Sequence, residues 1–161
     1  MKIELQTELS PDRARIEKYF RQADTCFEPK LSDQTDISAY AEKIAQYGCA
    51  IWCVCEEEDV GLCAFYANRP PEAFLTSLSV LKPFQGQGLA RRMLRELKRL
   101  CIRRNLDTIT LEVYRTNDRA QQLYQKEKFC ISLYSGEKYT MTTKVEGAKN
   151  YGEGFSSADQ L

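Results

Sequence analysis

Residues 75–94 read Leu75-Thr-Ser-Leu-Ser-Val-Leu-Lys-Pro-Phe-Gln-Gly-Gln-Gly-Leu-Ala-Arg-Arg-Met-Leu94. An apolar, β-branched run leads to Pro83, a turn with Gly86 and Gly88 follows, and an amphipathic basic helix is predicted to begin at once. Glycine lets the backbone approach a ligand closely, and the first N–H groups of a helix have no partner within it. The positive end of the helix dipole lies at the same place. The segment therefore predicts a backbone cradle that suits a pyrophosphate.

Two common phosphate-binding motifs do not fit this segment. A P-loop needs Lys and then Ser or Thr after its last glycine, whereas Leu89 and Ala90 follow Gly88. A dinucleotide fingerprint that starts at Gly86 needs a third small residue for close packing of helix on strand, and Arg91 stands there. Neither a P-loop nor a dinucleotide-binding site is therefore predicted.

The pattern Gln85-x-x-Gly88-x-Ala90 resembles the Q/R-x-x-G-x-G/A signature of the GNAT superfamily of N-acetyltransferases. The resemblance covers residues 1–145 in element order and residues 74–130 at the level of motifs. It implies an α/β fold with a mixed sheet and the element order β-α-α-β-β-β-α-β-α-β-β, and the sequence patterns give the same order.

A second hallmark of that superfamily follows about 30 residues later, in Leu111 to Phe129. It consists of a strand, an asparagine, and a helix that carries Ala, Leu-Tyr and a closing Gly-Phe. The matching residues here are Asn117, Ala120, Leu123, Tyr124 and Phe129. Lys128 replaces the glycine that commonly stops this helix, so the end of the helix is where a departure from the family is expected.

The length of 161 residues predicts one domain, placed at residues 1–146, with a disordered tail at 147–161. The absence of histidine excludes every mechanism based on that residue. The seven cysteines lack C-x-x-C spacing and suggest free thiols in a cytoplasmic protein. Cys49, Cys53 and Cys55 would share one face of a strand, where core packing is favoured over metal binding, and no metal site is expected.

Local signals place the remaining elements. Ser10 before Pro11 predicts a helix start, with the helix running to about Asp24. Residues 27–35 are expected to form a loop, and Asp36 is expected to cap a second helix that stops at Gly48. Residues 56–59 are expected to form an acidic hairpin turn between two strands.

The resemblance also implies how acetyl-CoA is held. The pantetheine arm would pair with the strand before the glycine turn, where the N–H of Val80 would face the thioester oxygen. Backbone N–H groups of the turn and helix start would bind the pyrophosphate, and Asn117 would contact the arm. The expected cofactor-binding residues are Leu78, Ser79, Val80, Gln85, Gly86, Gln87, Gly88, Leu89, Ala90, Arg91 and Asn117.

Two catalytic residues are expected from the same resemblance. Tyr124 would donate a proton to the leaving thiolate, although a core tyrosine on a helix also has a purely structural interpretation. Glu112 corresponds to the base proposed in the ribosomal-protein N-terminal alanine acetyltransferases, which share an L-E-V-x-x-x-N segment. Glu72 and a water relay are the alternatives for the base.

The function expected is transfer of an acetyl group from acetyl-CoA to a primary amine of a small molecule, an amino sugar being one possibility. Tyr40 and Tyr47 would be available to stack on a ring of that acceptor. A protein N-terminus or lysine is the alternative acceptor, and a non-catalytic acyl-CoA-binding module is the alternative class. The zero net charge argues against nucleic-acid and membrane partners, despite the basic segment 82–104. A monomer or a homodimer is expected.

Overall fold

A computed structural model describes residues 2–145, so the expected tail at residues 147–161 lies outside the described residues. The strands are β1 (Ile3–Glu8), β2 (Cys49–Cys55), β3 (Glu58–Arg69), β4 (Glu72–Val80), β5 (Thr108–Tyr114), β6 (Cys130–Ser135) and β7 (Lys138–Lys144). The helices are α1 (Arg13–Gln22), α2 (Leu31–Gln34), α3 (Ile37–Tyr47), α4 (Leu89–Arg103) and α5 (Asp118–Lys126), with 3-10 turns η1 (Asp24–Cys26) and η2 (Lys82–Phe84). The mixed α/β fold is confirmed, and one short helix, α2, lies in the segment that was expected to be a loop.

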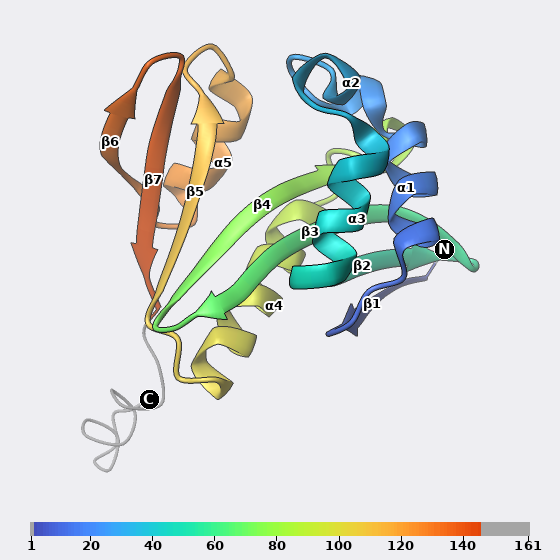
Figure 1. Cartoon of the computed structure of the whole chain (residues 1–161), viewed down its shortest axis with the longest axis horizontal. Coiled ribbons are helices and arrows are strands. Elements are labelled where there is room, and N and C mark those ends of the chain that lie inside the picture. Colours follow the sequence, from blue (N-terminus) through green and yellow to red (C-terminus); the bar gives the residue numbers. More distant parts are fainter. Residues whose placement is uncertain (1, 146–161) are drawn as a thin grey trace.

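The seven strands form one sheet in the order β1-β2-β3-β4-β5-β7-β6. All neighbours are antiparallel except β4 and β5, which are parallel and pair only from Glu72 with Thr108 to Leu75 with Leu111. Beyond that point the two strands separate like the arms of a V (Figure 1). The sheet therefore opens in its middle, at the carboxyl ends of β4 and β5.

A bulge in β4 lies where this opening begins. Ala64 of β3 pairs with Ser77 and the next residue, Phe65, pairs with Leu75, so Thr76 is the extra residue of the bulge. The bulge shifts the alternation of side chains by one, because Ala73 and Leu75 belong to the same core as Val80 and Leu78. It also explains why β4 carries apolar residues at both odd and even positions.

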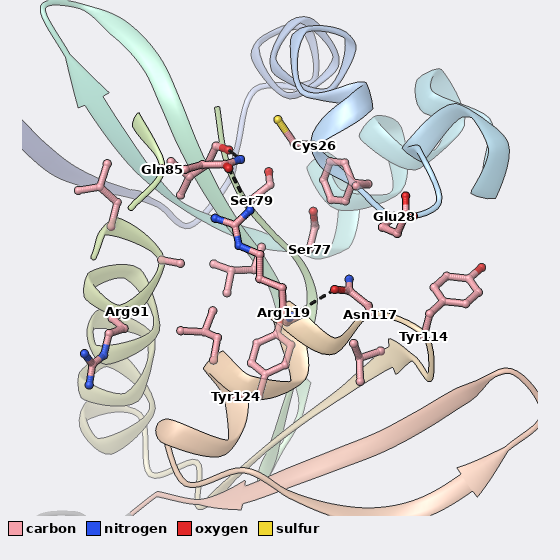
Figure 2. Close-up of a pocket in the computed structure, with 18 of the residues that line it drawn as sticks. Cys26, Glu28, Ser77, Ser79, Gln85, Arg91, Tyr114, Asn117, Arg119 and Tyr124 are labelled. Atoms are coloured by element: carbon pink, nitrogen blue, oxygen red, sulfur yellow. Dashed lines mark hydrogen bonds between the residues drawn. The ribbon is translucent and has the colours of Figure 1, made fainter. Parts of the chain in front are cut away.

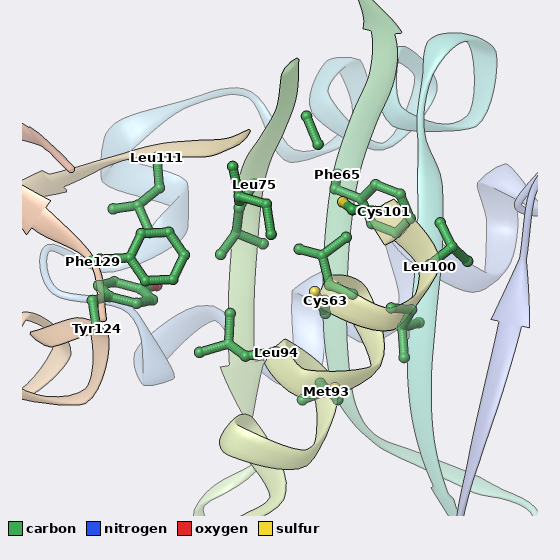
Figure 3. Close-up of a cluster of buried hydrophobic side chains, with 14 of the residues drawn as sticks. Cys63, Phe65, Leu75, Met93, Leu94, Leu100, Cys101, Leu111, Tyr124 and Phe129 are labelled. Carbon is green, nitrogen blue, oxygen red and sulfur yellow. The ribbon is translucent and has the colours of Figure 1, made fainter. Parts of the chain in front are cut away.

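Two hydrophobic cores cover the two faces of the sheet. Helices α4 and α5 supply Met93, Leu94 and Tyr124 to the first core, together with Phe129 just after α5 (Figure 3). Helices α1 and α3 cover the other face, where they form the second core with Trp52 of β2 through Ile16, Tyr19, Phe20, Ala41 and Ile44. The expected placement of Cys49, Cys53 and Cys55 on one face is confirmed, since all three contact the first core.

The first helix does not start as expected. Asp12, and not Ser10, is its N-cap: the carboxylate of Asp12 accepts the N–H of Arg15 at 2.9 Å. The expectation was wrong because Asp12 stands three residues before Arg15 and supplies the capping carboxylate, so that Ser10 and Pro11 both precede the helix. The Asp36 cap of α3 is confirmed by its bond to the N–H of Ala39 at 3.0 Å.

The end of α5 keeps the geometry that a glycine would give. Lys128 has a φ of 77°, in the left-handed region that glycine adopts at little cost. The N–H of Phe129 donates to the carbonyl of Tyr124 at 2.9 Å, and the N–H of Lys128 donates to that of Gln125 at 3.0 Å. These two bonds form a Schellman motif, so the expected departure is in the residue and not in the shape of the turn. Within residues 2–145 no helix has the length and apolar content of a membrane span.

Candidate active site

A pocket of about 370 Å³ lies where β4 and β5 have separated (Figure 2). Its wall comes from β4, the glycine turn, the start of α4, the end of β5 and α5, with the segment after α1 closing one side. Of the expected site residues, all except Gln87 are in this wall: Leu78, Ser79, Val80, Gln85, Gly86, Gly88, Leu89, Ala90, Arg91, Glu112, Asn117 and Tyr124. Gln87 lies in the turn but is exposed and does not line the pocket.

The glycine turn offers backbone donors to the pocket. Gly86 and Gly88 have φ values of 82° and 79°, and a Cβ built on either would meet no atom within 4 Å. Glycine is therefore required here by conformation and not by crowding within the protein. Helix α4 has no side-chain cap at Gly88, and its first internal bond runs from the N–H of Arg92 to the carbonyl of Gly88 at 3.0 Å. The N–H groups at the start of this helix are thus left for an anion.

Gln85 acts differently from the expectation. Its N–H already donates to the carbonyl of Lys82 at 3.2 Å, so it is not one of the free amides. Its side-chain amide instead donates to the carbonyl of Val80 at 2.8 Å and accepts from Arg119 at 3.1 Å. Gln85 therefore ties the end of β4 to α5, and it brings a guanidinium to the pocket wall that the sequence reasoning had missed.

The side chain of Arg91 also has a role that the sequence did not indicate. It leaves the pocket (Figure 2) and donates to the carboxylate of Glu127 at 2.9 Å, beside Arg95 at 3.4 Å. Lys98 donates to the carbonyl of Glu127 at 2.6 Å. Burial opposes the charge on Glu127, but the hydrogen bonds from the arginines outweigh it and lower its pKa. One side of the basic helix therefore fastens α4 to the end of α5.

The open edge of β4 presents main-chain groups to the pocket. The N–H of Leu81 donates to the carbonyl of Val60 across the β3–β4 ladder at 2.9 Å. Because successive residues of a strand point their N–H groups to opposite sides, those of Val80 and Leu78 point away from β3 and toward the opening. Unpaired strand amides are the groups with which an extended amide-bearing ligand pairs.

The buried Tyr19 and the half-buried Tyr40 hold β4 through hydrogen bonds from the helices that pack on the sheet. The hydroxyl of Tyr19, on α1, donates to the carbonyl of Ser79 at 3.2 Å and shares a bond of 2.9 Å with the Ser79 hydroxyl. The hydroxyl of Tyr40, on α3, donates to the carbonyl of Thr76 at 2.8 Å and lies 2.6 Å from the Thr76 hydroxyl. Burial raises the pKa of both phenols, so both stay neutral donors. Together they hold β4 at the bulge and at the residue before Val80.

Tyr124 lies on α5, in the wall of the pocket (Figure 2). Its ring is tilted by 60° against Phe129 with 5.6 Å between centroids. The Schellman motif fixes its carbonyl, so both ends of the residue are held. Burial raises its pKa above the usual value for a phenol. The phenol therefore keeps its proton throughout the physiological range, which suits a proton donor.

The two candidate bases lie in different places. Glu112 is on the exposed part of β5, lines the pocket, and pairs with Lys138 at 3.8 Å. Glu72 lies at the closed end of the β4–β5 pair and accepts a bond of 2.7 Å from the hydroxyl of Thr110. Glu72 does not line the pocket, so its place as an alternative base is not supported. The carboxyl ends of the strands lie at the opening, whereas Glu72 begins β4.

Asn117 caps α5, as expected, by accepting the N–H of Ala120 at 3.1 Å. It also lines the pocket, so its structural role and a contact with a ligand are compatible. Figure 2 shows its side chain directed into the space between β4 and α5. The same pocket wall includes Cys26, Phe27 and Glu28, none of which was expected at the site. Phe27 and Glu28 were expected in a loop.

A second compartment, of about 260 Å³, adjoins the first. The two share six residues, namely Phe27, Gln34, Thr76, Ser77, Glu112 and Tyr114. Tyr40 lines this compartment, but one face of its ring is stacked on Phe20 at 5.2 Å. Tyr47 is 54% exposed and lines neither compartment, so its expected role in stacking on an acceptor is not supported.

Comparison with known proteins agrees with this geometry. The sequence profile of the acetyltransferase (GNAT) family matches residues 15–129. The PaiA N-acetyltransferase of Thermoplasma acidophilum, solved in complex with coenzyme A, is 15% identical, with a TM-score of 0.74 over 89% of this chain and 99% of that chain. Ard1 from Thermoplasma volcanium is 21% identical, with a TM-score of 0.74 over 91% of this chain and 99% of that chain.

A third similar structure is the ribosomal-protein-S18-alanine N-acetyltransferase of Escherichia coli. It is 16% identical, with a TM-score of 0.73 over 91% of this chain and 96% of that chain. No curated protein matches the chain at the level of sequence. At these identities the structural likeness concerns the fold, whereas the family profile spans most of the sequence. The chain therefore belongs to the acetyltransferase (GNAT) family, and it is an N-acetyltransferase that uses acetyl-CoA.

Proposed function

We propose that this enzyme acetylates the primary amine of a small molecule, with Tyr124 as the acid and Glu112 as the base. The observation that carries the proposal is the meeting of two compartments at Glu112, one formed by β4, the glycine turn and α5, the other by α2, α3, β4, β5 and β7. The size of the second, about 260 Å³, supports a small acceptor.

The residues present fit acetyl-CoA. The positive φ of Gly86 and Gly88 brings a bare backbone to the pocket, and the start of α4 offers free N–H groups beside it. The turned-out amides of Leu78 and Val80 suit an amide-bearing arm, and Arg119 adds a positive charge at the wall. When bound, acetyl-CoA supplies the activated carbonyl carbon to which the amine nitrogen bonds as the carbon–sulfur bond breaks.

The chain supplies the proton transfers and the electrostatic stabilisation. Glu112 takes the proton that the amine loses, and Tyr124 gives its own to the departing sulfur. The N–H of Val80 stabilises negative charge that grows on the carbonyl oxygen, and the bonds from Tyr19 to the preceding residue hold that N–H in place. The two proton transfers balance, because Glu112 releases its proton to solvent and the phenol regains one from solvent after the product leaves.

The first experiment incubates the purified enzyme with acetyl-CoA and a panel of amines, and detects products by mass spectrometry. The panel contains amino acids, simple amines, amino sugars, and peptides with free N-termini or lysines. Turnover of metabolite-sized amines is expected. Turnover of peptides alone would overturn the choice of a small acceptor in favour of a peptide acetyltransferase.

The second experiment separates an enzyme from a module that only binds acyl-CoA. Tyr124→Phe is expected to lower kcat by about 100- to 10,000-fold, with the dissociation constant for coenzyme A unchanged. Tyr134→Phe is the matched control, because Tyr134 is 68% exposed and lies outside both compartments. Equal rates for the two variants would show that Tyr124 is not the proton donor.

We also propose that the protein is cytoplasmic, because its cysteines are free thiols in the described residues.

A further inference from the structure

The second compartment carries one positive and one negative side chain, and these lie next to each other. Tyr114 of β5 is paired with Lys138 of β7, and Glu112 lies two residues before Tyr114 on the same face. The ammonium of Lys138 is 3.8 Å from the carboxylate of Glu112 and 4.8 Å from the centre of the Tyr114 ring. No other charged residue lines this compartment in the described part of the chain.

The positions of Glu112 and Lys138 in the two compartments indicate how an acceptor is oriented. Glu112 lines both, whereas Lys138 lines only the second. An amine that reaches the acetyl donor must therefore pass Glu112, and the rest of the acceptor extends toward Lys138. The cation lies beyond the reacting end of the acceptor, within a few bonds of it.

We propose that the acceptor is an amino acid, whose carboxylate is bound by Lys138 while its amine lies at Glu112. This inference rests on the proposed function, since it names the acceptor of the same site. An amino acid carries an ammonium, which is complementary to the Glu112 carboxylate, and a carboxylate, which is complementary to the Lys138 ammonium. These two groups are a few bonds apart in the ligand, in keeping with the 3.8 Å between Lys138 and Glu112.

Little free energy is lost when such a ligand separates Lys138 from Glu112. The side chains of Lys138 and Glu112 are 38% and 50% exposed, and an ion pair at 3.8 Å in that setting contributes little to stability. Exchanging it for two new pairs, partly shielded from water by the ligand, is therefore favourable. An amino sugar carries no anionic group and would offer Lys138 only hydroxyls.

The uncharged residues of the second compartment indicate which side chain the amino acid carries. Phe27, Leu31 and Phe74 supply apolar surface to the second compartment. The compartment holds about 260 Å³, which accommodates one side chain and not a chain of residues. An amino acid with an apolar or aromatic side chain fits both the charges and the walls.

The test compares amines that differ in one group. Phenylalanine, phenethylamine and the phosphonate analogue of phenylalanine share a ring and an amine, and glucosamine represents amino sugars. Phenylalanine is expected to have a kcat/KM at least about tenfold above that of phenethylamine, because a partly shielded charge pair contributes about 1.4 kcal/mol or more. Preference for the phosphonate or for glucosamine would overturn the assignment of a carboxylate.

Substitutions of Lys138 test whether this residue causes the preference for phenylalanine over phenethylamine. Lys138→Met is expected to bring the ratio of the two kcat/KM values close to one, and Lys138→Arg to restore most of it. Lys144→Met is the control, because Lys144 is exposed at the other end of β7, opposite Thr108. A ratio that Lys138→Met leaves unchanged would refute the inference.

A measurement of phenylalanine binding tests the inference without requiring catalysis. Calorimetry of phenylalanine with the coenzyme A complex should show a dissociation constant at least about tenfold weaker for Lys138→Met than for Lys144→Met. Equal dissociation constants would refute the amino acid assignment. If no amine is acetylated while this binding difference is seen, the proposed reaction fails and the binding assignment stands.

Discussion

Replacement of Gly88 by alanine tests whether the backbone of the turn approaches a diphosphate. Gly88 has a φ of 79° and a ψ of 15°, and a Cβ there meets no atom within 4 Å. The cost to folding is therefore conformational, about 1–2 kcal/mol for an alanine in the left-handed region. The loss of unfolded-chain entropy offsets about 0.4–1 kcal/mol of this. The free energy of unfolding should fall by about 1 kcal/mol.

The effect on binding should be larger than the effect on folding. The new methyl group stands on the wall of the pocket, at the start of α4, where the free N–H groups are offered. It would push a bound phosphate away from those groups. Weakening of one charge-assisted contact by about 1.4 kcal/mol or more raises the dissociation constant for coenzyme A at least about tenfold.

Gly136 provides the matched control. It lies in the turn between β6 and β7, its φ is 59°, and a Cβ there also meets no atom within 4 Å. Gly136→Ala should therefore lose a similar stability, but it lines neither compartment and should bind coenzyme A like the wild type. Urea unfolding gives the stabilities, and calorimetry with coenzyme A gives the affinities.

One result would refute the reasoning. If Gly88→Ala shows the stability loss of Gly136→Ala together with wild-type affinity for coenzyme A, the turn does not hold the diphosphate by close approach of its backbone. A loss of affinity in both variants would instead mean that affinity follows global stability.

Three further predictions concern the framework of the site. Glu127→Gln should cost about 1–3 kcal/mol near pH 7 by urea unfolding. Because the folded pKa of Glu127 lies below its usual value, the difference from wild type should shrink as the pH falls through that folded pKa, and a constant difference would contradict it. Lys128→Gly should raise the free energy of unfolding by about 1 kcal/mol, since φ is 77° there, and a loss would show that the side chain itself is needed. Tyr19→Phe should cost about 1–2 kcal/mol and lower kcat, because it removes both bonds to Ser79; unchanged kcat would show that β4 is held without them.

Local signals were sufficient for much of the fold. The alternation, glycines and helical spacing of residues 75–103 depend on near neighbours, so β4, the turn and α4 were predicted within a few residues. The caps Asp36 and Asn117 were predicted for the same reason, since each acts three residues along the chain. Tyr124 and Glu112 were placed by resemblance, and the structure puts both on one pocket wall.

The parts that were missed depend on distant partners. Nothing near Thr76 in the sequence marks a bulge, because the bulge is defined by its pairing with β3. The partner of Arg91 is Glu127, 36 residues away, so no signal near Arg91 in the sequence indicated that this helix is joined to the end of α5. Tyr40 lines the second compartment, as an acceptor contact would require, but its hydrogen bond to Thr76 of β4 and its stacking on Phe20 were not predicted, because both partners are distant in the sequence.

The bulge in β4 depends on a distant partner, and it determines which main-chain groups of this locally predicted strand are open to a ligand. A regular β4 would continue its pairing with β5, and every amide of both strands would then have a partner. The extra residue at Thr76 comes directly after the last pair, Leu75 with Leu111, so it turns β4 away at that point. Separation leaves strand amides unpaired, which is unfavourable unless other groups bind them. Tyr40 binds the carbonyl of Thr76 at the bulge, and the N–H groups of Leu78 and Val80, which face the opening, are available to pair with an extended ligand. The main-chain groups left unpaired by the separation of β4 from β5 are therefore those that the enzyme has available to bind its acetyl donor.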